Sequence, residues 1–126
     1  RKAGKSQEAL DMYLEMRREG ITRDIITYTS ILKACESSRK HGLAMTILEH
    51  IIEDGMEIKI ECYRTAISTC QRAGNLNRGL STLKKLWLKN PPTREVSVAV
   101  VTFLSKLKKS RDANSLMQWL EKQGLE

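Results

Sequence analysis

Features typical of membrane, secreted and metal-binding proteins are scarce in this chain of 126 residues, which is long enough for one domain. No apolar run approaches the roughly 20 residues that a membrane-spanning helix needs, and no signal-peptide pattern opens the sequence. The three cysteines are an odd number and lack the C-x₂-C spacing of metal ligands, which argues against a disulfide framework or a zinc site. We therefore interpret Cys35, Cys62 and Cys70 as small buried residues of a protein kept reduced.

Catalytic signatures are missing as well. The sequence holds no nucleophile paired with a base, no glycine loop that would cradle phosphate, and no pair of catalytic carboxylates. His41 and His50 stand alone, and we interpret them as surface or turn residues rather than acid–base or metal-binding groups. The sequence therefore predicts no enzyme activity, no cofactor and no metal site.

The sequence does contain a period of about 35 residues. Each period carries one small residue and one turn former, and a tyrosine and a cysteine also recur. The positions are Ala9, Ala44, Gly79 and Ala113; Gly20, Gly55, Asn90 and Gly124; Tyr28 and Tyr63; Cys35 and Cys70. A spacing that holds across several independent residue types indicates an array of repeats.

The sequence of each repeat predicts two helices. Tyr63, Ala66, Ile67 and Cys70 fall at i, i+3, i+4 and i+7, which is one apolar stripe of a helix, and a second stripe starts at Leu76 after a break. A single hairpin of two short helices cannot cover its own stripes, whereas stacked copies can. We therefore predict an all-α fold, an α-solenoid of about 3.5 stacked helix-turn-helix hairpins that forms one domain over residues 1–126.

The expected repeats are 1–24 (partial), 25–59, 60–94 and 95–126 (degenerate). The expected helices are Lys5–Glu19, Ile26–Ser37, His41–Glu53, Glu61–Arg72, Leu76–Lys89, Arg94–Lys108 and Asp112–Gln123. Gly20 and Gly55 are expected to end helices in the left-handed conformation, and Asn75 and Ser110 to cap helix starts. Pro91-Pro92 cannot continue a helix and predicts a stiff junction. Because the first repeat lacks its first helix, we interpret the chain as part of a longer array.

The repeat resembles that of the pentatricopeptide repeat (PPR) family. The resemblance rests on Ile26-Thr27-Tyr28 at the start of a repeat and on Ala3-Gly4-Lys5, Glu8-Ala9-Leu10 and Gly20-Ile21 in a second half. It is strong through about Gly79 and weak after Pro91. The nearest alternative, the tetratricopeptide repeat, has a Trp and Leu-Gly pattern that this chain lacks.

The resemblance implies a strand of RNA along the first helices, with one base per repeat read by two side chains. One reading residue directly follows the tyrosine position, and here it is Thr29 or Arg64. The other is the last residue of the repeat, and here it is Asp24, Lys59 or Arg94. Lysine and arginine suit phosphate better than a base edge, and the last repeat offers only Val98 or Ala99 after the tyrosine position. We therefore expect phosphate contacts rather than sequence reading. The resemblance also implies an organellar location, in the mitochondrion or chloroplast.

Charge favours the same partner. The net charge is +7, and residues 1–59 hold ten basic and ten acidic side chains, so residues 60–126 carry all of the excess. A polyanion such as single-stranded RNA is the natural partner of such a surface. The residues predicted to contact RNA are Asp24, Thr29, Lys33, Lys59, Arg64, Arg72, Arg94 and Lys106. The neutral first half and the irregular readers leave an alternative open, a PPR-like scaffold that docks protein subunits of an organellar assembly.

Four further groups have expected roles in packing or on the surface. Tyr28 and Tyr63 are predicted to lie in the core, and the tryptophans to pack between hairpins. The methionines, which lie mainly on the stripes of second helices, are interpreted as core residues. The acidic run Glu49, Glu53, Asp54 and Glu57 is expected to form a solvated face, with pairing inside the molecule as the second interpretation. The tryptophans are Trp87 and Trp119, and the methionines are Met12, Met16, Met45, Met56 and Met117.

Overall fold

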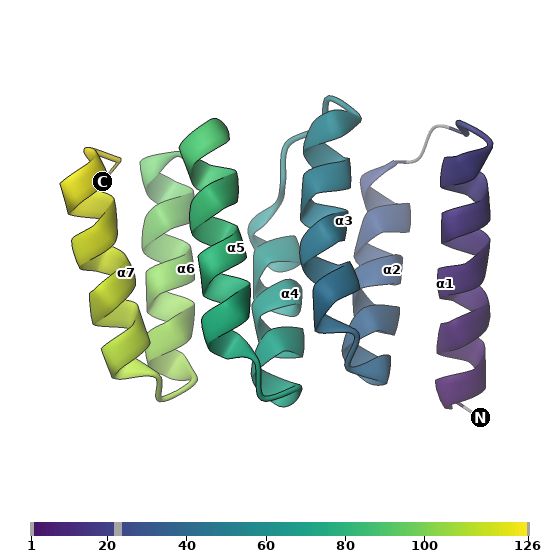
Figure 1. Ribbon diagram of the computed structural model, residues 1–126, viewed down its shortest axis with the longest axis horizontal. Coiled ribbons are helices and arrows are strands. Elements are labelled where there is room, and N and C mark those ends of the chain that lie inside the picture. The colour runs from purple at the N-terminus through teal and green to yellow at the C-terminus, as the bar shows by residue number, and fades with distance from the viewer. Residues whose placement is uncertain (1, 22–23, 126) are drawn as a thin grey trace. The chain divides into compact units, whose positions relative to one another are not determined.

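The computed structural model describes residues 2–21 and 24–125, with side chains from Ser6 onward, so the side chains of the Ala3-Gly4-Lys5 motif lie outside the described residues. Those ranges contain seven α-helices and no strand, which confirms the predicted all-α class (Figure 1). The helices are α1 (Lys2–Arg18), α2 (Ile25–Ser38), α3 (His41–Glu53), α4 (Ile60–Arg72), α5 (Leu76–Lys89), α6 (Arg94–Lys106) and α7 (Ser110–Gln123).

Helix ends mostly lie where the sequence predicts them. Gly20 and Gly55 end helices with φ of 73° and 76°, as expected. The α6–α7 turn differs, because α6 stops at Lys106 and Lys108 takes the left-handed conformation with φ 64°. Helix α7 then begins at Ser110, and Lys109 occupies the cap position without a capping side-chain bond. The prediction of Ser110 as the cap was therefore wrong.

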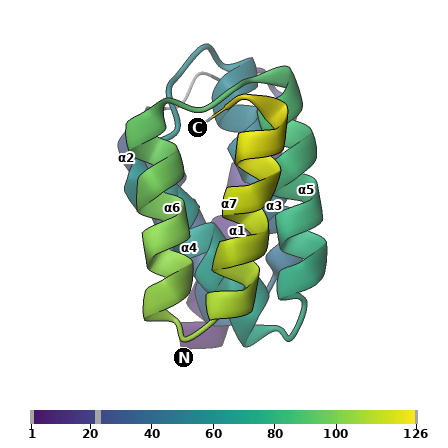
Figure 2. The same cartoon turned by 90° about the vertical axis from the view of Figure 1, so that its left-hand side faces the viewer.

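The chain divides into two compact parts, residues 1–83 and 84–126, and each is described by itself. In the first part α1 packs on α2, and α2 and α3 both pack on α4. Figures 1 and 2 show α2 and α4 in one layer of this part, with α1 and α3 in the other. In the second part α6 and α7 form an antiparallel pair joined by a short turn (Figure 2).

The apolar stripes of the first part form its core. Tyr28 and Tyr63 are buried there, which confirms their predicted role. Full burial of each apolar side chain stabilises the fold by about 1.5–3 kcal/mol. The three cysteines are free and buried, also as predicted. Burial raises the pKa of the Cys35 thiol to about 12 and that of Cys70 to about 11, so both remain protonated at neutral pH.

The interpretation of all methionines as core residues was wrong for two of them. Met12 is 65% exposed and Met117 is 42% exposed, whereas Met45 is buried. Met12 stands between the buried residues Leu10 and Tyr13 in the sequence. Because a helix has about 3.6 residues per turn, Met12 nevertheless lies on another face of α1. Trp87 is buried as expected, and the half-buried Trp119 lies 5.9 Å from the Lys84 ammonium nitrogen.

Helices α4 and α5 approach each other closely at Gly79. A β-carbon built on Gly79 would lie 2.5 Å from Cys70 Sγ and 3.0 Å from Cys70 Cβ. Real β-carbons do not come so close to a neighbour, so no larger residue fits without movement of one helix. In the preceding repeat the matching pair is Cys35 with Ala44, both fully buried. The small residue Gly79 is thus a contact point between the two helices of its repeat.

We predict that Gly79→Ala destabilises the protein by about 1–2 kcal/mol. Alanine improves helix propensity by about 1 kcal/mol over glycine, but overpacking a dense core costs about 1–3 kcal/mol. Thermal and denaturant unfolding followed by circular dichroism would measure the change. In a Cys70→Ala background, where the clashing sulfur is absent, the same substitution should destabilise much less or become stabilising.

Gly42→Ala is the matched control, because Gly42 lies in α3 with nothing within 4 Å of its virtual β-carbon. It should stabilise the protein by up to about 1 kcal/mol through helix propensity alone. Equal effects of the two substitutions would contradict the close approach at Gly79.

Candidate nucleic-acid interface

Helices α2 and α4 expose neighbouring stripes in the first part of the chain. The stripes, which we call the first-helix face, consist of Ile26, Ser30, Lys33 and Ser37 on α2 and of Glu61, Arg64 and Arg72 on α4. Two contacts join their borders: Lys33 Nζ lies 3.9 Å from Glu61 Oε2, and Ser68 Oγ donates to Glu36 Oε2 at 2.6 Å. The face therefore brings together three of the predicted cations, Lys33, Arg64 and Arg72.

Two predicted reader residues occupy the caps of these helices. Asp24 is the N-cap of α2 and Lys59 is the N-cap of α4. Thr29, one turn into α2, donates its hydroxyl to the Ile25 carbonyl at 2.9 Å and lies 3.9 Å from Cys62 Sγ of α4. Thr29 and Lys59 consequently stand near the same ends of two packed helices, while the hydroxyl oxygen of Thr29 can still accept a hydrogen bond.

Asp24 has a structural role that the sequence reading missed. Its Oδ1 accepts from the Thr27 backbone N–H at 2.9 Å and from Thr27 Oγ1 at 2.8 Å. These two bonds lower the pKa of the Asp24 carboxyl below its ordinary value. The signal was present in the sequence, because an Asp immediately before a helical stripe is a common N-cap.

Stability at acid pH should depend on this cap. The folded-state pKa of Asp24 is lowered, so its contribution is complete above the unfolded Asp pKa of about 3.9 and is lost as the pH falls through the lower folded value. Asp24→Asn keeps a capping oxygen but does not titrate, and we expect its stability to fall less than that of wild type below pH of about 4. Urea unfolding across this pH range measures the difference, with Asp24→Ala as the variant that lacks the cap at every pH.

Salt bridges on and beside the first-helix face are weak. Lys33 pairs with Glu61 at 3.9 Å, Lys59 with Glu57 at 3.8 Å, and Arg72 with Glu36 at 3.9 Å. Such exposed pairs contribute about 0–1 kcal/mol each, so a phosphate can displace the carboxylate. Arg64 is exposed and forms no ion pair with any residue that the structure describes.

The last two predicted contact residues lie on α6, in the second part of the chain. Both Arg94 and Lys106 are exposed, at opposite ends of that helix. Thr93 caps α6 by accepting from Val96 N at 3.2 Å, so it occupies the position that Asp24 and Lys59 hold in their helices. Arg94, predicted to end a repeat, is instead the first residue of α6.

The start of α6 at Arg94 decides which of the two candidate residues, Val98 or Ala99, follows the tyrosine position in the last repeat. Buried Ser97 stands where α2 and α4 carry their buried tyrosines. Val98 therefore follows the tyrosine position, and Ala99 does not. Val98 is 55% exposed and presents no hydrogen-bonding group to a base.

A hollow of about 420 Å³ lies on the α6–α7 pair. Its lining includes Val98 and Val101 of α6 and Met117 and Leu120 of α7. Counted from the helix starts, these residues match Thr29, Leu32, Leu48 and Ile51 of the α2–α3 hairpin, which packs against α4. The hollow is thus the counterpart of a helix-packing surface, which also explains why Met117 and Val98 are exposed.

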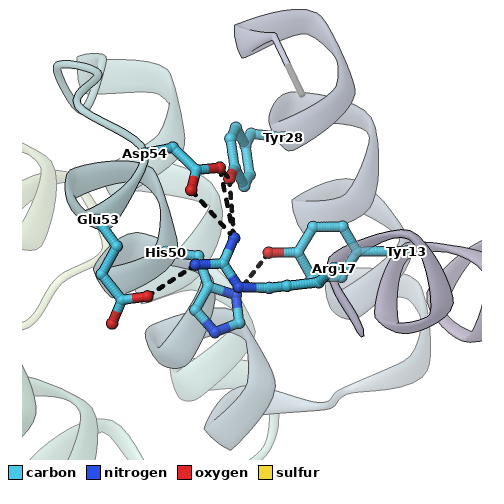
Figure 3. Close-up of polar contacts among 6 residues, drawn as sticks. All are labelled: Tyr13, Arg17, Tyr28, His50, Glu53 and Asp54. Carbon is cyan, nitrogen blue, oxygen red and sulfur yellow. Dashed lines mark hydrogen bonds and ion pairs between the residues drawn. The ribbon is translucent and has the colours of Figure 1, made fainter. Parts of the chain in front are cut away.

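A polar cluster fixes α1 and α3 against the start of α2 (Figure 3). Arg17 Nη2 donates to Glu53 Oε1 at 2.7 Å, and its Nη1 donates to Asp54 Oδ2 at 3.3 Å and to the Tyr28 hydroxyl at 3.2 Å. Tyr28 also donates its hydroxyl to Asp54. Glu53 and Asp54 are therefore paired inside the molecule, the second of the two interpretations of the acidic run. Since Tyr28 immediately precedes Thr29, the cluster also positions a predicted reader.

A second polar contact lies beside this cluster. The Tyr13 hydroxyl is 2.5 Å from His50 Nδ1, and the ring of Tyr13 meets that of Tyr28 edge-on with centroids 6.0 Å apart. His50 is therefore a half-buried partner of a buried tyrosine, and its interpretation as a surface or turn residue was incomplete. The sequence could not show this, because Tyr13 and His50 are 37 residues apart.

We predict that Arg17→Met destabilises the protein by about 1–3 kcal/mol, because it removes the guanidinium from a carboxylate that is only 21% exposed. Glu53→Gln removes the partner that is 64% exposed and should cost about 0–1 kcal/mol. Denaturant unfolding of both variants gives the comparison. Equal losses would show that burial of the Arg17–Asp54 pair is unimportant.

Comparisons with known proteins give one consistent result. The sequence profile of the pentatricopeptide repeat domain matches residues 12–72, and that of the PPR repeat matches residues 1–21. Together these profiles match more than half of the 126 residues. A pentatricopeptide repeat-containing protein of Arabidopsis thaliana is 29% identical over 103 residues, 81% of this chain and 16% of that protein. Another from the same plant, named as mitochondrial, is 30% identical over 74 residues, 58% of this chain and 12% of its own length.

Solved structures agree on the fold. The maize pentatricopeptide repeat protein PPR10 superposes with a TM-score of 0.57 at 20% identity, covering 98% of this chain and 18% of that one. PPR10 in complex with an 18-nt psaJ RNA element superposes with a TM-score of 0.56 at 20% identity, and the match covers 96% of this chain and 18% of the PPR10 chain. The chain thus spans less than a quarter of the length of these relatives and neighbours. Over residues 2–21 and 24–125 no helix is long and apolar enough to cross a membrane.

Proposed function

The chain belongs to the pentatricopeptide repeat family, and from that premise we propose that it is a non-catalytic RNA-binding segment. It holds single-stranded RNA on the first-helix face, mainly through phosphate contacts, and acts in organellar RNA metabolism. The observation that carries the proposal is the exposed guanidinium of Arg64, which has no carboxylate partner among the described residues and lies two helical turns from Arg72.

The charge of the face supports phosphate rather than base contacts. Lysine and arginine side chains neutralise phosphates without reading sequence. On α2 and α4 the basic members, Lys33, Arg64 and Arg72, are all exposed. Their carboxylate neighbours Glu36 and Glu61 approach only to 3.9 Å, and these surface pairs yield to a phosphate at small cost.

Relatives support the RNA partner and the location. PPR10, which shares the fold, was crystallised with an 18-nt RNA element, and one similar plant protein is named as mitochondrial. Fractionation of cells that express the tagged full-length protein tests the location, and a protein recovered only in the cytosol contradicts it.

We predict that the chain binds single-stranded RNA with an affinity that falls steeply with salt, by about 0.7 in log K per log salt for each phosphate neutralised. Arg64→Gln with Arg72→Gln should weaken binding by up to about fivefold per residue at about 0.1 M salt. Filter binding or fluorescence anisotropy with a labelled RNA of random sequence measures both effects.

The control is Arg18→Gln with Lys85→Gln, which removes the same charge from α1 and α5. It should weaken binding much less, because neither residue belongs to the first-helix face. RNA binding that is undetectable at low salt, or that does not vary with salt, overturns the proposed function.

A further inference from the structure

The turns inside the three hairpins share one backbone geometry. In each turn the N–H of one residue bonds back to the carbonyl three residues earlier, and the N–H of the next residue bonds back five residues. The pairs are Arg39 N to Glu36 O (3.2 Å) and Lys40 N to Cys35 O (2.9 Å), Gly74 N to Gln71 O (3.1 Å) and Asn75 N to Cys70 O (2.9 Å), and Lys108 N to Ser105 O (2.9 Å) and Lys109 N to Leu104 O (3.0 Å). This pattern is the Schellman motif, and its central residue must adopt a left-handed conformation.

A glycine fills that central position in only one of the three turns. Gly74 has φ 75°, whereas Arg39 and Lys108 hold the same place with φ 56° and 64°. They are the two non-glycine residues with positive φ among the described residues. A side chain at positive φ costs stability that glycine does not, so two long cations stand where the backbone alone favours glycine. Such local strain points to a function of the side chains.

Further cations lie within a few residues of the three turns in the sequence. Together with Arg39 and Lys108 they form a set that we call the turn cations: Arg39, Lys40, Arg78, Lys108, Lys109 and Arg111. All are exposed except Lys109, which is half-buried. Within the residues that the structure describes, none of them forms an ion pair.

The opposite ends of the same helices carry the opposite charge in the first part of the chain. The connection from α3 to α4 contains Glu53, Asp54 and Glu57 against Lys59, and Asp24 caps α2. In the first part of the chain the hairpin turns therefore carry cations, whereas the connection from α3 to α4 carries a net negative charge.

We propose that the turn cations of each part bind phosphates of the RNA backbone, as contacts additional to those of the first-helix face. The proposal rests on the proposed function. Helix α2 has 14 residues and is about 21 Å long, so Arg39 lies far from Asp24 and Thr29 at its start. The turn cations therefore contact phosphates and not the bases near those readers. The left-handed position holds a cation in two of the three turns, and the chain gives up backbone stability at those two turns to keep it there.

The first test removes the two cations with the double substitution Arg39→Gly and Lys108→Gly. All three turns then have glycine at the left-handed position, as the Gly74 turn already does. The melting temperature of this variant should stay equal or rise, because the strain is relieved. Affinity for a labelled random single-stranded RNA should fall by about 25-fold at about 0.1 M salt, and the slope of log K against log salt should shrink by about 1.4. Lys85→Gln with Lys89→Gln removes the same charge from α5 and should change both quantities much less.

The test of gain is Gly74→Lys, which adds a cation at the third turn. Nothing lies within 4 Å of the virtual β-carbon of Gly74, so its cost is the positive φ alone. Melting temperature should fall while RNA affinity rises by about fivefold at about 0.1 M salt. Gly55→Lys is the matched control, because Gly55 has the same conformation (φ 76°) and equal space in the connection from α3 to α4. It should lower the melting temperature similarly without the gain in affinity.

Two results overturn the inference while leaving the proposed function intact. In one, wild type binds RNA but Arg39→Gly with Lys108→Gly weakens binding no more than the α5 control. In the other, Gly74→Lys and Gly55→Lys raise the affinity equally, which would reflect net charge alone. A wild-type protein that does not bind RNA overturns the proposed function itself, and the inference with it.

Discussion

The structure depends on the mutual burial of apolar stripes that no single hairpin can hide. In residues 1–83 helix α4 packs on both helices of the preceding hairpin, and Cys62, Ala66 and Thr69 of α4 are fully buried. Small residues on this stripe let the helices approach closely, so burial does not require large side chains. Contacts remain local in sequence, as in other repeat arrays, and each hairpin relies on its neighbour.

The same burial decides where polar groups lie on the first helices, namely on one open stripe and at the two ends. Once each first helix buries one side and packs its neighbour on another, only a narrow stripe and the two termini remain open. On α2 the open stripe carries Lys33, and on α4 it carries Arg64 and Arg72. At the termini, the Arg17 cluster connects three helices around the buried ring of Tyr28. The surface proposed for RNA is therefore the part of the first helices that helix packing leaves exposed to solvent.

Turn geometry adds a further constraint that is independent of packing. Every hairpin closes with the same Schellman motif, and the motif fixes which residue takes the left-handed conformation. Where glycine fills that site the chain gains freedom, and where Arg39 or Lys108 fills it a charge is projected from the turn. Stability and charge placement thus compete at a single residue of each repeat. This competition distinguishes the hairpin turns from the glycine-ended connections at Gly20 and Gly55.

Local sequence patterns were sufficient to predict the period, the all-α class, the helix ends at Gly20 and Gly55, and the burial of Tyr28, Tyr63 and the cysteines. These properties follow from local periodicity and backbone preference, which are written in adjacent residues. The contact of His50 with Tyr13 and the pairing of Arg17 with Asp54 could be found only in the folded structure. Each of these partners is 37 residues away in the sequence, so the contact depends on how the helices pack. The register of α6 also needed the structure, because its sequence departs from the repeat after Pro91.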